Sequence, residues 1–356
     1  MGDNYLWSDV MDWNTYRELY EKKAIEKKIP LEKIKLKLEY AEKLFLNELP
    51  IIYNAYHLSN LVGISHEYLF KISNSPNSGY RKFKIDKKNG GTRTINEPLP
   101  NLKIVQNWIL REILENISVS PYAKAYKKGV NIKSNVRFHK KQKLVFHLDI
   151  KDFFINLKQH KVLSLFLKLG YSKEVSVLLA KLCTLNNSLP QGAPTSAYLS
   201  NVLLGNFDNS ISKLCNSKHI RYTRYADDMN FSGDFNYKKL QYRVVQELSN
   251  LGLELNEEKT TLMKKNQRQI VTGIVVNEKV QVPNNMRKQL RKEVYFIQKY
   301  GIKSHIQHTN MDTTEDYYLK SLLSRIGYCI FINPEEKELI KYHDYIKKII
   351  TVSNDN

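Results

Sequence analysis

Residues 222–231 read Tyr-Thr-Arg-Tyr-Ala-Asp-Asp-Met-Asn-Phe and place two adjacent acids between two stretches of β-prone residues. Side chains of neighbouring strand residues point to opposite faces of a sheet, so only a turn lets both carboxylates approach one site. The segment therefore predicts a hairpin with Asp227 and Asp228 at or near its turn. Taken alone, an Asp-Asp pair is more often a turn or capping element than a site.

A third acid, Asp149, ends an apolar strand that the sequence predicts over residues 144–149. Three carboxylates at strand ends could hold two Mg²⁺ ions about 4 Å apart, one activating a 3′-hydroxyl and the other stabilising the leaving pyrophosphate. Asp149, Asp227 and Asp228 are therefore the candidate metal-binding and catalytic residues of a nucleotidyl transfer site.

The segments around these acids alternate between strand and helix patterns. After the first strand, the sequence predicts a helix (about 160–182), a loop (185–194), a helix (195–214), a strand pair (220–232), a helix (236–251) and a strand (about 253–262). This order predicts an α+β fold in which helices flank the strands.

The rest of the chain is predicted to be helical, with two additional hairpins. These elements are helices at 16–48 (broken at Pro30), 53–72 and 102–117, hairpins at 80–98 (turn at Asn89-Gly90-Gly91) and 270–282, and a helical tail from residue 284. The pattern at 53–72 resembles a helix-turn-helix, but a simple helical hairpin explains the same spacing at least as well.

Composition favours a folded, basic protein that binds a polyanion. The 356 residues include 56 Lys and Arg against 36 Asp and Glu, a formal net charge of +20, and 23 tyrosines offer rings for stacking. Three widely spaced cysteines predict neither a disulfide framework nor a zinc site and fit a reducing compartment. The sequence shows no signal-peptide pattern and no apolar stretch of 18 residues, so we expect a cytoplasmic protein that does not enter a membrane.

Three motifs in order resemble those of reverse transcriptases. Tyr225-Ala-Asp-Asp228 is similar to the family's Tyr-x-Asp-Asp box, Leu148-Asp-Ile-Lys-Asp-Phe-Phe154 to its first palm motif, and Leu189-Pro-Gln-Gly-Ala-Pro-Thr-Ser196 to the motif between them. The resemblance implies an RNA-directed DNA polymerase with a right-hand fold. Its implied parts are an N-terminal helical region (1–79), fingers (80–143), a palm (144–265) and a helical thumb with the second hairpin (266–356).

The resemblance assigns roles to the acids and to one lysine. Asp149 and Asp227 are implied to bridge both Mg²⁺ ions, with Asp228 more peripheral and the Ile150 carbonyl completing one coordination sphere. Lys259 matches the lysine that is expected to protonate pyrophosphate, although a lysine in a basic chain can equally be a surface charge.

Nucleotide-binding residues are implied as well. Phe154 falls where the family places the ring that crowds a 2′-hydroxyl and selects deoxynucleotides, with core packing as the alternative. Gln191 and Gly192 match the contact to the incoming sugar and template base, where a small residue permits close backbone approach.

In the basic hairpin, Lys87 and Arg93 match the residues that hold the triphosphate in this family. An arginine binds phosphate through a planar fork, whereas a lysine acts as a point charge. Lys84 or Lys88 could make the lysine contact instead.

Two further segments resemble signatures of bacterial retron reverse transcriptases. Asn135-Val-Arg-Phe-His139 is similar to the retron Asn-Ala-x-x-His signature, with Val136 in place of Ala, and Val271-Thr272-Gly273 to the Val-Thr-Gly signature. The resemblance implies that these residues bind RNA or lie near its path. Alternatively, Asn135 and His139 form a surface pair on a helix, and Gly273 is an ordinary turn residue.

The helical tail is strongly basic, with seven Lys or Arg against one acid between residues 279 and 308. Such a segment can track a phosphate backbone. The candidate RNA contacts are Arg287, Lys288, Arg291 and Lys292. Three interleaved rings, Tyr295, Phe296 and Tyr300, can stack on bases or pack inside the thumb.

A retron enzyme is implied to bind its own structured noncoding RNA and to extend DNA from the 2′-hydroxyl of one guanosine. The product would be branched multicopy single-stranded DNA, made from dNTPs through an RNA–DNA hybrid. Retrons generally pair the polymerase with a separate effector protein in antiphage defence, so such a partner is expected.

Two rival hypotheses remain. Another bacterial defence or group II intron-like reverse transcriptase would copy a different RNA and give ordinary 3′-primed products. A noncatalytic RNA-binding scaffold would keep the palm shape alone, but clustered acids that repel one another without metal argue against it.

Overall fold

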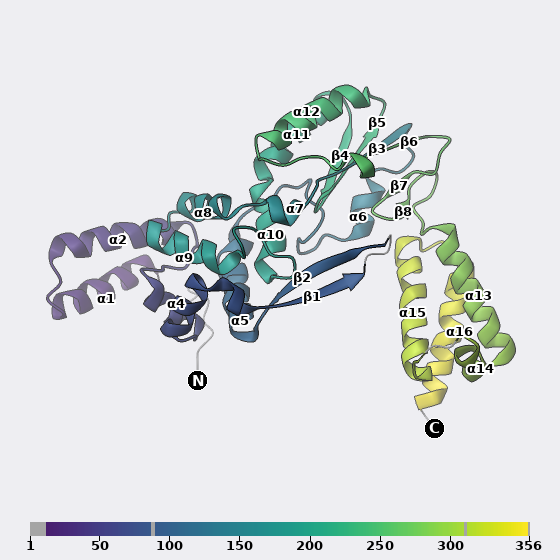
Figure 1. The fold of residues 1–356 in the computed structure, drawn as a ribbon, viewed down its shortest axis with the longest axis horizontal. Helices are drawn as coiled ribbons and strands as arrows, with labels where there is room; N and C mark the ends of the chain where they lie inside the picture. The colour runs from purple at the N-terminus through teal and green to yellow at the C-terminus, as the bar shows by residue number, and fades with distance from the viewer. Residues whose placement is uncertain (1–11, 87–89, 310–311, 355–356) are drawn as a thin grey trace. The chain divides into compact units, whose positions relative to one another are not determined.

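The computed structural model describes residues 12–86, 90–309 and 312–354, with side chains up to Thr351 (Figure 1). The chain forms two compact units, each assembled from segments that are separate in the sequence. Unit 1 comprises Met1–Pro121, Lys151–Asn209 and Asn250–Leu253, and unit 2 comprises Tyr122–Ile150, Ser210–Ser249 and Glu254–Asn356. The predicted α+β fold is confirmed. The predicted boundaries of fingers, palm and thumb stay a prediction.

Unit 1 begins with short helices, because Pro and Gly residues divide its apolar periodicity. Its helices up to residue 116 are α1 (Trp13–Glu26), α2 (Leu31–Leu46), α3 (Ala55–Val62), α4 (His66–Asn74), η1 (Pro76–Gly79), α5 (Pro100–Glu112) and η2 (Leu114–Asn116). Pro30 precedes α2, where the sequence predicts the break. Gly63 ends α3 in the left-handed conformation, with φ 73°.

The basic hairpin of unit 1 is present as predicted. Strand β1 (Tyr80–Asp86) pairs antiparallel with β2 (Thr92–Pro98). Gly90 and Gly91 have φ values of 85° and 78°, a conformation that glycine adopts without strain.

Two helices predicted as continuous are divided in the structure. The helix expected at about 160–182 is α8 (Gln159–Lys168) followed by α9 (Lys173–Cys183), and Gly170 between them has φ 101°, which no α-helix contains. The helix expected at 195–214 is α10 (Pro194–Leu203) followed by α11 (Gly205–Ser217). A single turn, α7 (Phe153–Asn156), precedes α8.

Unit 2 is built on an antiparallel sheet with strand order β4-β5-β3-β6. Its strands are β3 (Leu144–Asp149), β4 (Arg221–Tyr225), β5 (Asp228–Gly233) and β6 (Thr261–Lys264). Helix α12 (Tyr237–Ser249) packs on the sheet, where the Tyr237 ring meets Phe146 edge-on. Strand β6 starts later than the strand predicted at about 253–262, because η3 (Glu257–Lys259) forms a turn first.

The remaining elements of unit 2 share one buried core with this sheet. They are α6 (Ile132–Arg137), β7 (Ile270–Val271), β8 (Ile274–Val275), α13 (Asn284–Tyr300), α14 (Ile302–His308), α15 (Glu315–Ile332) and α16 (Lys337–Asn354). The core runs from Val145 of β3 through Val271 to Leu290 and Leu322 of the helices. A bilayer-spanning helix, which needs about 20 apolar residues, does not occur in the described part of the chain.

Candidate active site

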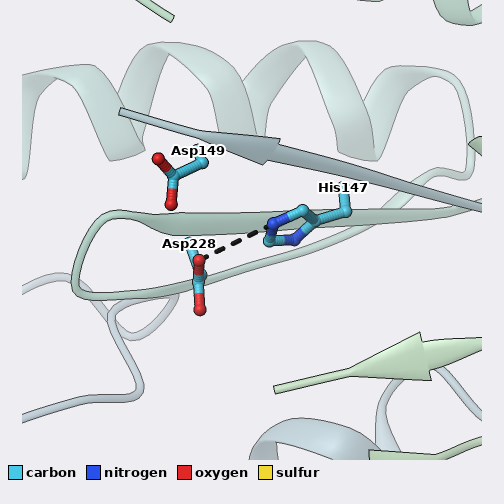
Figure 2. A group of neighbouring side chains, drawn as sticks. All are labelled: His147, Asp149 and Asp228. Atoms are coloured by element: carbon cyan, nitrogen blue, oxygen red, sulfur yellow. Dashed lines mark ion pairs between the residues drawn. The ribbon is translucent and has the colours of Figure 1, made fainter. Parts of the chain in front are cut away.

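Two carboxylates face each other at one end of the unit 2 sheet. Asp149 is the last residue of β3 and Asp228 the first of β5, and the antiparallel register places them opposite each other. Their oxygens and a ring nitrogen of His147 all lie within 4.8 Å of one another (Figure 2). The three side chains therefore form a group that could hold a metal ion.

The turn between β4 and β5 carries the two adjacent acids, as predicted. Tyr225 pairs with Asp228, so Ala226 and Asp227 form a two-residue loop. Ala226 has φ 58°, a conformation that glycine normally supplies, and backbone strain of this kind is common at functional sites. The main-chain oxygen of Asp227 accepts a hydrogen bond from Ile150 N at 3.1 Å, which ties the turn to the end of β3.

Asp149 is a buried carboxylate with a lysine partner. Only 2% of its surface is exposed, and Lys259 Nζ donates to both of its carboxylate oxygens at 2.9 Å. Partial burial alone lowers the pKa of the Lys259 ammonium, but the hydrogen bond and charge of Asp149, with Asp227 and Asp228 nearby, raise this pKa overall. Lys259 therefore stays charged at neutral pH and compensates the buried acid.

Asp228 lies in a different environment. Burial raises the pKa of its carboxyl to about 6, His147 opposes that shift, and the charges of Asp227 and Asp149 add to it. A divalent cation would relieve this repulsion, and carboxylate oxygens are the ligands that Mg²⁺ and Ca²⁺ prefer. The donor set thus fits a hard divalent ion.

The nucleotide-binding residues predicted from the resemblance belong to unit 1. Gln191 O accepts a hydrogen bond from Asn96 N of β2 at 2.7 Å, which ties the Pro-Gln-Gly turn to the basic hairpin. A Cβ at Gly192 would lie 2.8 Å from the Asn96 oxygen, so only glycine fits there. Phe154 is half-buried beside the buried Phe153. Arg93 is exposed.

Not every predicted triphosphate contact can be placed. Lys87 and its alternative Lys88 lie outside the described residues. Lys84 is exposed on β1, on the same hairpin as Arg93.

The two retron signatures meet each other inside unit 2. Asn135 and His139 are completely buried, and Asn135 Nδ2 donates to Thr272 Oγ1 at 3.4 Å. Both nitrogens of the His139 ring lie 2.8 Å from hydroxyl oxygens of the sheet, those of Ser232 and Thr223. The expected RNA contact of the Asn135 and His139 side chains does not fit this burial, and neither does the alternative of a surface pair. His139 anchors the turn after α6 to the sheet, and Asn135 joins α6 to the turn between β7 and β8.

The second signature also has a partly internal position. Val271 is buried, whereas Thr272 is half-buried and Gly273 exposed at the turn between β7 and β8. Only Thr272 and Gly273 therefore offer atoms to a partner.

The predicted basic contacts on α13 fall into two classes. Arg287 pairs with Glu336 at 3.1 Å, and Arg291 binds both oxygens of Glu338 at 2.7 and 2.5 Å. Lys288 and Lys292 are exposed. Of the interleaved rings, Tyr295 and Tyr300 are exposed and Phe296 is half-buried.

Sequence reasoning missed His147. Its place two residues before Asp149 was a usable signal, because residues i and i+2 of a strand share a face. What the sequence lacked was the β3–β5 register, which puts Asp228 beside the ring.

The fold is that of a nucleic-acid polymerase. Residues 85–281 match the family described as reverse transcriptase (RNA-dependent DNA polymerase). The chain belongs to the reverse transcriptase family, and it is an RNA-directed DNA polymerase of the retron type.

The proteins that this chain is similar to include two retron reverse transcriptases and a telomerase. The chain is 33% identical over 265 residues to the retron Ec86 reverse transcriptase of Escherichia coli, covering 73% of this chain and 82% of that protein. It is 31% identical over 302 residues to the retron Mx65 reverse transcriptase of Myxococcus xanthus, covering 78% and 67%. A telomerase structure from Candida albicans in complex with a fragment of telomeric RNA aligns with TM-score 0.46 at 11% identity, covering 83% and 68%.

Proposed function

We propose that this polymerase copies part of its own structured noncoding RNA into branched multicopy single-stranded DNA, primed from an RNA 2′-hydroxyl. The observation that carries the chemistry is the facing pair Asp149 and Asp228 at the strand ends. The similarity to two retron reverse transcriptases over most of the chain supports the choice of RNA. All three cysteines are free and buried, which fits a reaction in the reducing cytoplasm.

Two Mg²⁺ ions would be held by Asp149, Asp227 and Asp228, with the Ile150 carbonyl as a further ligand. Bound there, the ions would lower the pKa of the attacking hydroxyl and neutralise charge on the leaving pyrophosphate. The charges of Asp227 and Asp149, which add to the raised pKa of Asp228, support this role, because divalent ions would relieve the repulsion among the three acids.

The chain's own groups have distinct parts in the transfer. The primer hydroxyl oxygen forms a bond to the α-phosphorus of the dNTP while the bond from that phosphorus to the bridging oxygen breaks. Lys259 would donate its proton to the departing pyrophosphate, and its raised pKa keeps that proton available at neutral pH. Arg93 and Lys87 would hold the triphosphate.

Selection of the substrate would depend on unit 1. Phe154 would crowd a 2′-hydroxyl, so that deoxynucleotides are preferred. Gln191 and Gly192 would contact the sugar and the template base, with the close packing of Gly192 on β2 fixing the turn.

RNA would be bound by two exposed cations of α13, Lys288 and Lys292, and by Thr272 and Gly273 at the turn between β7 and β8. Arg287 and Arg291 would support this face through their pairs with Glu336 and Glu338. We further propose that the DNA product and a separate effector protein act in antiphage defence.

Primer extension tests the chemistry. With an RNA template, a DNA primer, dNTPs and Mg²⁺, the protein should incorporate nucleotides, and Asp149→Asn should abolish incorporation. Asp152→Asn is the matched control, because Asp152 is exposed and its side chain makes no capping hydrogen bond. Incorporation that is absent from the unaltered protein, or indifferent to Asp149→Asn, would favour the noncatalytic scaffold.

The branched product tests the retron assignment. The gene is expressed with its upstream RNA, and the DNA that co-purifies is treated with a 2′–5′ debranching enzyme and sequenced. We expect one DNA species whose RNA branch is released by that enzyme. Only 3′-primed products would favour another type of bacterial reverse transcriptase. Protection from phage that survives Asp149→Asn would contradict the defence role of the DNA.

A further inference from the structure

His147 lies beside the facing carboxylates, and the proposed function gives it no role. It is two residues before Asp149 on β3, and its register partner on β5 is Asn230. Because side chains alternate along a strand, the pair His147 and Asn230 shares a face with the pair Asp149 and Asp228. Two neighbouring cross-strand pairs thus form one polar group.

The two ring nitrogens of His147 have different partners. Nε2 lies 3.6 Å from Oδ1 of Asp228, drawn as a dashed line in Figure 2, and Nδ1 lies 3.2 Å from Oδ1 of Asn230. The His147 side chain is 20% exposed, and Asn230 is completely buried. The buried amide therefore holds one side of the imidazole while the other side faces the carboxylate.

Asn230 can still form a further hydrogen bond. Its Nδ2 is buried and has no hydrogen-bond partner among the described residues. A 180° rotation of the amide would let Nδ2 donate to Nδ1 of His147. In that rotated orientation Nδ1 accepts, so the single hydrogen of a neutral imidazole is on Nε2 and faces the carboxylate of Asp228, which accepts it.

We propose that His147 is a positioning residue for Asp228, and that Asn230 and His147 together fix this carboxylate in the orientation that binds a divalent ion. The inference rests on the proposed function, since it concerns Asp228 as a metal ligand. It gives each of the two facing acids its own partner in the chain, Lys259 for Asp149 and His147 for Asp228.

Direct coordination by His147 is the competing hypothesis, and the contacts argue against it. Mg²⁺ prefers oxygen ligands, whereas imidazole suits zinc, copper and iron. With the Asn230 amide rotated, Nδ1 accepts from Nδ2 and the hydrogen on Nε2 points to Asp228, so neither nitrogen offers a lone pair to an ion.

Binding of Mn²⁺ to the full chain, followed by the EPR signal of the free ion, tests the proposal without nucleotide. His147→Ala should weaken Mn²⁺ binding about tenfold or more, as loss of a residue that orients a metal ligand generally does. His147→Gln keeps an amide nitrogen near Asp228 and should restore affinity to within about threefold. His160→Ala, at an exposed position on α8, is the matched control and should leave binding unchanged.

A double-mutant cycle makes the test sharper. Asn230→Ala should weaken Mn²⁺ binding in the same direction as His147→Ala. The double variant should bind no more weakly than His147→Ala alone, because the amide acts through the imidazole. If the losses of Mn²⁺ affinity in the two single variants add up in the double variant, Asn230 does not act through His147. If His147→Ala does not fold, the Gln variant and Asn230→Ala still decide the question.

Other results would overturn the proposal. His147→Ala could bind Mn²⁺ like the unaltered protein, or His147→Gln as weakly as His147→Ala. Pulsed EPR could also show a directly coordinated imidazole nitrogen on the bound Mn²⁺, which would make His147 a ligand. These results would contradict the positioning role of His147 but not the proposed polymerase chemistry. An unaltered protein that binds no Mn²⁺ would overturn the proposed metal site as well.

Discussion

Lys259 binds both oxygens of Asp149 although 57% of its side chain is exposed. The ammonium therefore neutralises the buried acid while its long stem remains free to swing toward a phosphate. In the proposed function, the same ammonium group would neutralise Asp149 before the reaction and donate a proton to the departing pyrophosphate.

Replacing Lys259 tests the proton-donor role. Lys259→Met should slow single-nucleotide incorporation about a hundredfold at saturating dNTP, measured by rapid quench, because general acids contribute roughly 10²–10⁴-fold. Lys259→Arg keeps the charge but cannot release a proton, so it should be almost as slow. Lys264→Met, at an exposed position on β6, is the control. Full activity of the Lys259→Arg variant would contradict the proton-donor role and leave Lys259 only an electrostatic role.

Gly192 is the second residue whose identity the structure explains. Its φ is 115°, and a Cβ there would lie 2.8 Å from the oxygen of Asn96. Gly192→Ala should lower the free energy of unfolding by about 1–3 kcal/mol in urea titrations, because strain and overlap combine. Gly129→Ala isolates the backbone contribution, since Gly129 has φ 73° and no atom within 4 Å of the added Cβ. Equal losses in the two variants would contradict the close packing on β2.

Among the elements, the segment from α6 to β3 depends on one buried side chain. Burial, with the charge of Arg221 adding to it, lowers the pKa of His139 to about 3. The neutral ring bridges hydroxyls of β4 and β5, so protonation would leave a charge without compensation inside the sheet.

The stability of unit 2 should therefore depend on pH. The folded-state pKa of His139 lies below the unfolded value of about 6.5, so the unfolded chain binds the extra proton first and stability falls as pH drops below that value. Between pH 7 and 5 the loss should be about 2 kcal/mol in urea titrations. His139→Gln should flatten this part of the profile, and the difference between the two profiles removes the contribution of other histidines. Parallel profiles would contradict the neutral state of the ring.

For the whole molecule, the net charge of +20 predicts nucleic-acid binding that weakens steeply with salt. Lys288 and Lys292 are two of the exposed cations on α13. A Lys288→Ala, Lys292→Ala double variant should reduce the slope of log Kd against log salt by about 1.5, since each phosphate contact contributes roughly 0.7–0.9. Filter binding to the cognate RNA measures this slope. The control with equal charge loss is Lys22→Ala with Lys27→Ala, at exposed positions on α1 and at its C-cap. An equal reduction of this slope in the control variant would contradict an RNA contact at Lys288 and Lys292.

The local sequence was sufficient to predict those features whose geometry depends on one short segment. The Ala226-Asp227 turn and the β3 strand that ends in Asp149 followed from alternation and turn chemistry. The break at Gly170 was missed although the glycine was visible, because apolar periodicity continued on both sides. His147, Asn135 and His139 needed strand register and tertiary packing, which no short window of sequence contains.

The contact between Lys259 and Asp149 joins residues 110 positions apart in the chain. During synthesis, β3 leaves the ribosome long before its neighbours β5 and β6 do. A nascent chain shorter than about 264 residues thus lacks part of the sheet that carries the acids, so we expect a chain that terminates before this point to be inactive.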